Sequence, residues 1–175
     1  MPNLLAVCLD SGDTLVDEGT EVKDADAVVL RGELIPGAAE LVRSLKEQGY
    51  RLALVADGPA GSFHNLLREQ HKLWDDFDAF AISGEVGVEK PHPAVFHHAL
   101  GQLGIAPADY GRTVMVGNNL ERDIKGANAL GMISVWLDWA PRRSKIPADA
   151  SEAPQHTIKQ PLELLAVLRQ LERSG

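Results

Sequence analysis

The chain has 175 residues, 45% of them hydrophobic and 24% charged, which predicts one globular domain with a proper core rather than a disordered chain. Its formal net charge of −8 argues against nucleic acid and anionic lipid as partners, because an acidic surface repels both. The single cysteine, Cys8, cannot form an intrachain disulfide, and the sequence shows neither a signal-peptide pattern nor a membrane-spanning stretch, so a cytoplasmic protein is expected.

Short apolar runs along the chain predict β-strands, and helical patterns separate them. Runs of this length and composition are typical of strands that are buried on both faces of a parallel sheet. The predicted strands are residues 4–9, 51–56, 80–83, 113–117 and 133–137, with a weaker run at 156–159. The predicted helices are residues 36–48, 61–70, 93–103, 121–130 and 161–171. This alternation predicts an α/β fold, a doubly wound parallel sheet of five to six strands with helices on both faces.

Two segments depart from this alternation. Residues 17–35 have no helical period, and two short β-like stretches within them predict a hairpin flap after the first strand. Residues 140–155 are polar and contain proline, which predicts a mobile loop. Residues 1–175 are therefore expected to form a single domain.

The residues that follow the strands carry the expected chemistry, because ligands of such sheets bind beyond the carboxyl ends of the strands. Asp10 ends the first strand and can act as a carboxylate nucleophile. Mg²⁺ prefers oxygen ligands, which Asp10, the main-chain carbonyl of Gly12, and Asp123 or the amide oxygen of Asn118 could supply. Lys90 offers a positive charge to a phosphate oxygen and to Asp10 itself.

Hydrogen-bond donors complete this predicted phosphoryl-transfer site. Thr14 and the glycine-rich backbone around it can donate to a phosphoryl group. Together these residue types predict magnesium-assisted phosphoryl transfer.

Four motifs resemble those of the haloacid dehalogenase superfamily of hydrolases, in the family's order. They are DSGDTL at residues 10–15, LALVADG at 52–58, VEKPHPAVF at 88–96 and the run from 114 to 131. The resemblance implies the doubly wound sheet with a hairpin flap and no cap domain. It also implies a Mg²⁺-dependent phosphatase that forms an aspartyl-phosphate on Asp10.

Three positions depart from the family pattern. Family phosphatases usually carry a second aspartate two residues after the nucleophile, as acid and base, and here that residue is Gly12. A local backbone shift that swings Asp13 into the site is the replacement we expect. Ala56 stands where a hydroxyl side chain normally holds the phosphate, beside Asp57 and Gly58, and Asn118 replaces an aspartate.

These departures keep a second function open. A catalytically weakened member of the family would bind Mg²⁺ and a phosphorylated ligand or protein partner. A third reading, a receiver domain that accepts a phosphoryl group, draws on Asp10, Asp57 and Lys90, but the chain's extra length and the run from 117 to 131 argue against it.

Several candidate residues also have purely structural interpretations. Asp57 is expected to cap the next helix, Asn118 is either a helix cap or a ligand, and Asp123 could simply begin a helix. Arg142 could contact substrate as part of a basic rim, although a solvated loop is the simpler expectation. The expected partners are a phosphorylated small molecule or a larger phosphorylated substrate, and a second copy of the chain as a lid.

Overall fold

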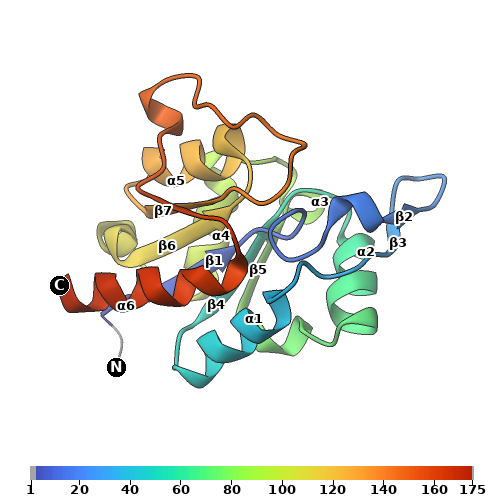
Figure 1. Cartoon of the computed structure of the whole chain (residues 1–175), viewed down its shortest axis with the longest axis horizontal. Coiled ribbons are helices and arrows are strands. Elements are labelled where there is room, and N and C mark those ends of the chain that lie inside the picture. Colours follow the sequence, from blue (N-terminus) through green and yellow to red (C-terminus); the bar gives the residue numbers. More distant parts are fainter. Residues whose placement is uncertain (1–2, 175) are drawn as a thin grey trace.

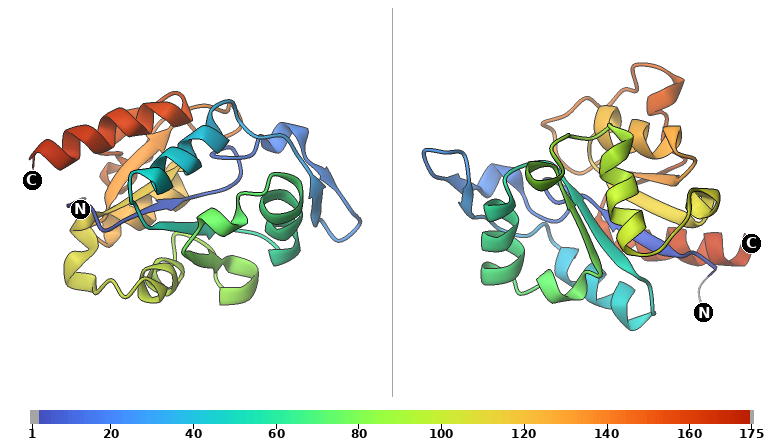
Figure 2. Two further views of the ribbon diagram at one scale, coloured as in Figure 1. Left: turned by 90° about the horizontal axis from the view of Figure 1, so that it is seen from below. Right: turned by 180° about the vertical axis from the view of Figure 1, so that it is seen from behind.

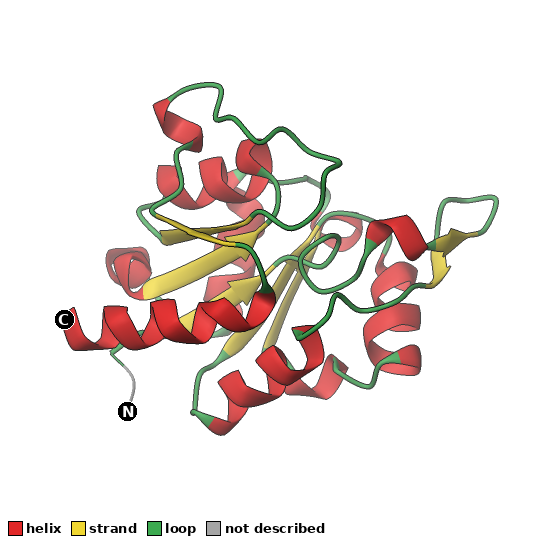
Figure 3. Ribbon diagram, viewed as in Figure 1, coloured by secondary structure: helices red, strands yellow, loops and turns green. Residues whose placement is uncertain are grey.

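The computed structural model describes residues 3–174 and is built around one six-stranded sheet (Figures 1 and 3). Every pairing in this sheet is parallel, and the strand order is β5-β4-β1-β6-β7-β8. The strands are β1 (Ala6–Leu9), β4 (Leu52–Ala56), β5 (Ala79–Ile82), β6 (Thr113–Gly117), β7 (Ile133–Leu137) and β8 (His156–Ile158). The predicted parallel sheet is confirmed, including its weakest strand.

The central strands are apolar on both faces because both faces are covered. In β1, Val7 and Leu9 belong to one hydrophobic core, whereas Ala6 and Cys8 belong to a second core on the opposite face. All residues of β1, β4 and β6 are buried. Successive side chains of a strand point to opposite faces, so a continuous apolar run is what such a position requires.

Helices cover the two faces of the sheet (Figure 2). Those of the first core are α1 (Ala38–Glu47) and α6 (Leu164–Ser174); α4 (Pro93–Gln102) and α5 (Lys125–Ala129) pack on the second. The shorter helices are α2 (Ala60–Phe63), which continues as π-helix His64–Gln70, α3 (Ser83–Val86) and the π-helix Leu120–Ile124 that leads into α5. The 3-10 turns are Glu18–Thr20, Trp74–Asp76, Pro107–Arg112, Ala150–Glu152 and Pro161–Glu163.

A small antiparallel hairpin projects from the connection between β1 and α1 (Figures 1 and 2). It consists of β2 (Val22–Lys23) and β3 (Val29–Arg31), as the flap prediction requires. The Val29 amide donates to Ser62 Oγ at 2.9 Å, and Asn65 Nδ2 donates to the Val29 carbonyl at 2.9 Å. The hairpin is therefore fixed to α2 and its π-helical extension.

The strand order places the polar loops together. β1 lies between β4 and β6, so the strand order reverses at β1 and the chain leaves all three strands at the same edge. Asp10, Asp57 and Asn118 each follow one of these strands. Such a switch point is where open α/β sheets bind ligands. Within residues 3–174, no helix has the length and apolar character needed to cross a bilayer.

Candidate active site

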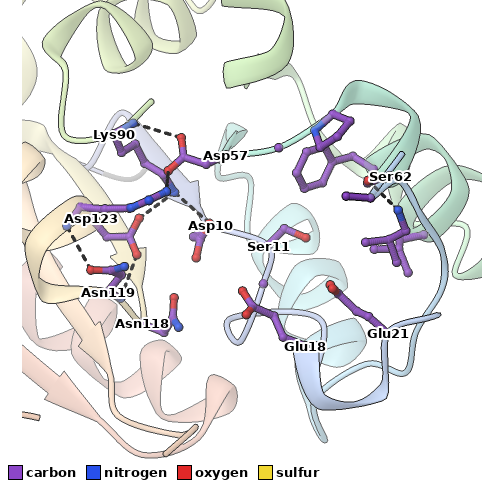
Figure 4. Close-up of a pocket in the computed structure, with 18 of the residues that line it drawn as sticks. Asp10, Ser11, Glu18, Glu21, Asp57, Ser62, Lys90, Asn118, Asn119 and Asp123 are labelled. Atoms are coloured by element: carbon purple, nitrogen blue, oxygen red, sulfur yellow. Dashed lines mark hydrogen bonds and ion pairs between the residues drawn. The ribbon is translucent and has the colours of Figure 1, made fainter. Parts of the chain in front are cut away.

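Asp10 occupies the centre of the site. Its amide donates to the Val116 carbonyl at 3.0 Å, which extends the pairing of β1 with β6 by one residue. Its carboxylate is largely buried; Oδ2 accepts from Thr14 Oγ1 at 3.2 Å and Oδ1 from Lys90 Nζ at 2.8 Å. Asp10 is thus held in one orientation at the carboxyl end of β1 (Figure 4).

Lys90 is a buried cation with anionic and neutral acceptors around it. Its Nζ lies 2.8 Å from Asp10 Oδ1 and 2.7 Å from Asp123 Oδ1, and it donates to the Val55 carbonyl at 2.7 Å. Burial works to lower the pKa of Lys90, but the Asp10 and Asp123 carboxylates outweigh it and raise this pKa above its ordinary value. Lys90 therefore stays charged.

Asp123 and Asn118 lie beside this cation. Asp123 is 1% exposed, and its Oδ2 accepts from the Asn119 amide at 3.0 Å. Burial, and then the nearby Asp10 carboxylate, raise the pKa of Asp123. A side chain at Gly117 would come within 2.1 Å of Asp123, so this close approach requires glycine.

Within residues 3–174, the side-chain amide of Asn118 has an unpaired hydrogen-bond donor. Asn118 is buried, and its Nδ2 has no hydrogen-bond partner among the described residues. The alternative that Asn118 caps the following helix is wrong: Asn119 does so, because its Oδ1 accepts from the amides of Glu121 at 3.1 Å and Arg122 at 3.2 Å. Asn118 instead lines the cavity next to Asp10.

The donor set fits a magnesium ion. Two buried carboxylates, Asp10 and Asp123, share one ammonium, which leaves an excess of negative charge at the site. Mg²⁺ typically uses one or two protein carboxylates, with neutral oxygens and water completing its coordination. Among residues 3–174 no three His, Cys, Asp or Glu side chains group as metal ligands. Neutral oxygens from Asn118 or the Gly12 carbonyl would therefore have to contribute.

Asp57 connects three loops of the site. Its Oδ1 accepts from the Lys90 amide at 3.0 Å and its Oδ2 from Arg122 Nη1 at 3.1 Å. Our expectation that Asp57 caps the next helix is wrong, because the N-cap of α2 is Pro59 and the Asp57 carboxylate points to Lys90 and Arg122 instead. Arg122 was not predicted as a site residue. Its position next to Asp123 was the only feature of the sequence that could have indicated it.

Five of the six predicted phosphate-binding residues divide into two groups by their access to the cavity. Asp57, Gly58 and Lys90 line the cavity, although the Gly58 amide donates to Ser83 Oγ at 2.9 Å. Thr14 and Ala56 lie buried behind it, with Thr14 Oγ1 committed to Asp10. The first group is thus the one that a ligand can reach.

Asp13 and Arg142 pair with each other outside the cavity. Asp13 is fully buried, and its two carboxylate oxygens accept from Arg142 Nε at 2.9 Å and Nη2 at 2.7 Å. The Glu18 amide donates to the same carboxylate at 3.0 Å, and Arg142 also donates to Asp17 at 2.6 Å. A catalytic Asp13 and a phosphate-binding Arg142 would both require this pair to separate.

The cavity itself has a volume of about 240 Å³. One side is formed by the loops after β1, β4 and β6, and the other by the hairpin and α2 (Figure 4). Its lining includes Arg143, which the sequence offers as part of a basic rim, and four charged residues that the sequence did not predict: Glu18, Glu21, Lys23 and Arg122. Burial, and then the Asp13 carboxylate, raise the pKa of Glu18. Only the three-dimensional course of residues 17–31 brings the hairpin side chains to Asp10.

Comparison with known proteins gives a consistent relationship. The family model for haloacid dehalogenase-like hydrolases matches residues 3–131. The chain is 34% identical over 139 residues to the glyceraldehyde 3-phosphate phosphatase of Methanopyrus kandleri, covering 79% of this chain and 58% of that protein. It is 35% identical over 127 residues to the phosphoserine phosphatase of Thermus thermophilus, covering 71% and 47%.

A solved structure supports the same relationship. The HAD phosphatase from Thermococcus onnurineus aligns with a TM-score of 0.66 and 29% identity, covering 78% of this chain and 58% of that one. The chain spans about half the length of the curated relatives it matches. Because the family model matches most of its length and the four motifs meet at one site, the chain belongs to the haloacid dehalogenase-like hydrolases.

Proposed function

We propose that the chain is a Mg²⁺-dependent phosphatase that hydrolyses phosphate monoesters through an aspartyl-phosphate on Asp10. The observation that carries the proposal is the Asp10 carboxylate, fixed at the switch point by Thr14 and Lys90 and open to a cavity. An oriented carboxylate next to a buried cation is suited to in-line attack on phosphorus.

In the first step, an Asp10 oxygen attacks phosphorus as the bond from phosphorus to the ester oxygen breaks. Lys90 orients Asp10 through its hydrogen bond to Oδ1 and offers positive charge to the phosphoryl oxygens. In the second step, water attacks the phosphorus of the aspartyl-phosphate and Asp10 leaves. Mg²⁺, held by Asp10, Asp123, Asn118 and the Gly12 carbonyl, would supply charge neutralisation for the phosphoryl group.

The size of the cavity supports one class of substrate. A volume of about 240 Å³ suits a small phosphorylated molecule, and the hairpin closes one side without an inserted cap domain. The relatives named for glyceraldehyde 3-phosphate and phosphoserine support small phosphate esters as substrates.

The catalytically weakened alternative has its own observation. Gly12, Ala56 and Asn118 replace residues that family phosphatases use, and Ala56 offers no hydroxyl at the end of β4. Such a protein would bind Mg²⁺ and a phosphorylated ligand without turnover.

Phosphate release from a panel of small phosphate monoesters separates the two functions. With Mg²⁺ present, we expect turnover by the wild type and background rates for Asp10→Asn, which keeps the shape of the side chain but removes the nucleophile. Chelation of the metal should have the same effect. Asp75→Asn, at an exposed position away from the cavity, is the matched control. Turnover that persists in Asp10→Asn would exclude Asp10 as the nucleophile.

A further inference from the structure

Phosphate ester hydrolysis of this kind needs a group that moves protons. An alkoxide leaving group must be protonated as its bond to phosphorus breaks, and the water that follows must lose a proton. This requirement rests on the proposed function. The question is which side chain in the cavity is free to meet it.

Most carboxylates near Asp10 are already committed. Asp123 is held by Lys90 and the Asn119 amide, and Asp57 by the Lys90 amide and Arg122. Asp13 is fully buried against Arg142 and does not line the cavity.

The remaining acidic side chains in the cavity come from residues 18–21. Glu21 lies 3.2 Å from the ammonium of Lys23, its neighbour on the hairpin. Glu18 receives no side-chain hydrogen bond within the described part of the chain, and its only ionic contact is Arg143, whose Nη2 lies 3.5 Å from Glu18 Oε2. Glu18 is therefore the carboxylate that is least restrained and still faces the cavity.

The position of Glu18 follows from the absence of a side chain at residue 12. A Cβ atom built on Gly12 would lie 2.3 Å from Glu18 Oε1 and 3.0 Å from Glu18 Cδ and Cγ. The Glu18 carboxylate thus fills the space that a side chain two residues after Asp10 would occupy. Figure 4 shows this carboxylate directed at the Ser11 loop, on the cavity side.

We propose that Glu18 is the catalytic acid and base of the site, and that it replaces from the 3-10 turn the carboxyl group that Gly12 lacks. In the first step, the Glu18 carboxylic acid gives its proton to the ester oxygen as the bond between that oxygen and phosphorus breaks and Asp10 bonds to phosphorus. In the second, the Glu18 carboxylate takes a proton from water as the water oxygen bonds to phosphorus and the Asp10–phosphorus bond breaks. Both residues are thereby regenerated.

The choice of leaving group tests this role. An alkyl phosphate needs a proton on its leaving oxygen, whereas p-nitrophenyl phosphate releases a stable phenolate without one. For Glu18→Gln we expect kcat on the alkyl ester to fall about a hundredfold or more with little change in KM, because acid–base help is worth that much. With p-nitrophenyl phosphate, the variant should release a rapid burst of about one nitrophenolate per enzyme and then turn over slowly. The burst is expected because the second step is slow: without Glu18 no carboxylate takes the proton from the water that attacks the aspartyl-phosphate.

A rescue experiment distinguishes proton transfer from a structural role. Gly12→Asp alone should be impaired, since its Cβ would collide with the Glu18 carboxylate. Glu18→Ala makes room for the new side chain. The double variant Gly12→Asp with Glu18→Ala should therefore hydrolyse the alkyl ester at least tenfold faster than Glu18→Ala alone. Glu33 is an exposed glutamate in the same segment. Glu33→Gln removes one negative charge, as Glu18→Gln does, and is therefore the control for the loss of charge.

The possible outcomes are distinct. Asp10-dependent turnover that Glu18→Gln leaves unchanged, or lowers equally for both esters without a burst, would overturn the role of Glu18 and leave the proposed phosphatase standing. No Asp10-dependent turnover by the wild type on either ester would overturn both.

Discussion

At the scale of single residues, Lys90 determines the electrostatics of the site. One buried ammonium lies within 2.8 Å of Asp10 and 2.7 Å of Asp123, on segments far apart in the sequence. Buried charges are tolerated only when they are paired, and an ion pair that loses one partner leaves the other charge uncompensated. Lys90 thus holds the carboxylates of Asp10 and Asp123 together at one site.

Cys8 offers a test of the burial beneath the site. It is fully buried in β1, two residues before Asp10, and burial raises the pKa of its thiol from 9.0 to about 12, although Lys90 opposes the shift. Because the thiolate is the reactive form, we expect the folded protein to resist alkylation between about pH 7 and pH 10, whereas the unfolded chain should react. Mass spectrometry with and without denaturant measures this.

The raised pKa of Cys8 also determines the direction in which stability changes with pH. A raised folded-state pKa means that the unfolded chain loses the thiol proton first as the pH rises. The stability that Cys8 contributes below its ordinary pKa of 9.0 should therefore be lost as the pH rises toward about 12. Rapid alkylation of the native protein near neutral pH would contradict the burial of β1.

At the scale of elements, the packing of α5 against α4 depends on a glycine. A Cβ at Gly126 would lie 2.4 Å from the ring of Phe96, which is fully buried and cannot move away. We expect Gly126→Ala to lower the free energy of unfolding by about 1–3 kcal/mol, the usual cost of overpacking a core. Urea denaturation gives this value.

Gly101 in α4 is the matched control. A Cβ there would meet no atom within 4 Å, so Gly101→Ala should stabilise the protein by roughly 0.5–1 kcal/mol through the higher helix propensity of alanine. Equal effects of the two substitutions would show that the α4–α5 contact is looser than described.

The secondary structure and part of the site were predictable because they depend on local patterns. Strands buried on both faces are continuous apolar runs, and Asp10, Lys90 and Asp123 stand in recognisable motifs. Glu18 and Arg122 were not predicted, because their positions in the cavity depend on contacts with Gly12 and Asp57 that only the folded chain creates. The 3-10 turns, including Glu18–Thr20, are too short to show a period.

At the scale of the whole molecule, Arg142 ties the long loop after β7 to the first loop of the site. Its guanidinium donates to both oxygens of the buried Asp13 and to Asp17, across more than a hundred residues of sequence. The loop at residues 140–155 was predicted to be mobile; this contact fixes its first part to the loop that carries Gly12.

Removing this tether should be costly. Among the described residues, Arg142→Gln leaves the buried Asp13 carboxylate with only the Glu18 amide as a donor, so we expect a loss of about 1–3 kcal/mol in the free energy of unfolding. The neighbouring Arg143→Gln removes only a partly exposed contact with Glu18, for which about 1 kcal/mol or less is expected. If thermal unfolding shifts equally in both variants, the Asp13 pair is no more than a surface contact.

The central place of β1 in the sheet has a consequence for how the protein is made. Val7 pairs with Leu52 on one side and with Val114 on the other, so the first strand of the chain is completed only by residues more than a hundred positions later. A nascent chain that has left the ribosome only as far as α4 presents one unpaired apolar edge of β1 to its neighbours, which invites aggregation. Asp123 arrives on the same late segment that closes this edge. We therefore expect the closing of the sheet and the arrival of Asp123 beside Asp10 and Lys90 to coincide, so that recovery of the proposed activity during refolding follows the burial of β1.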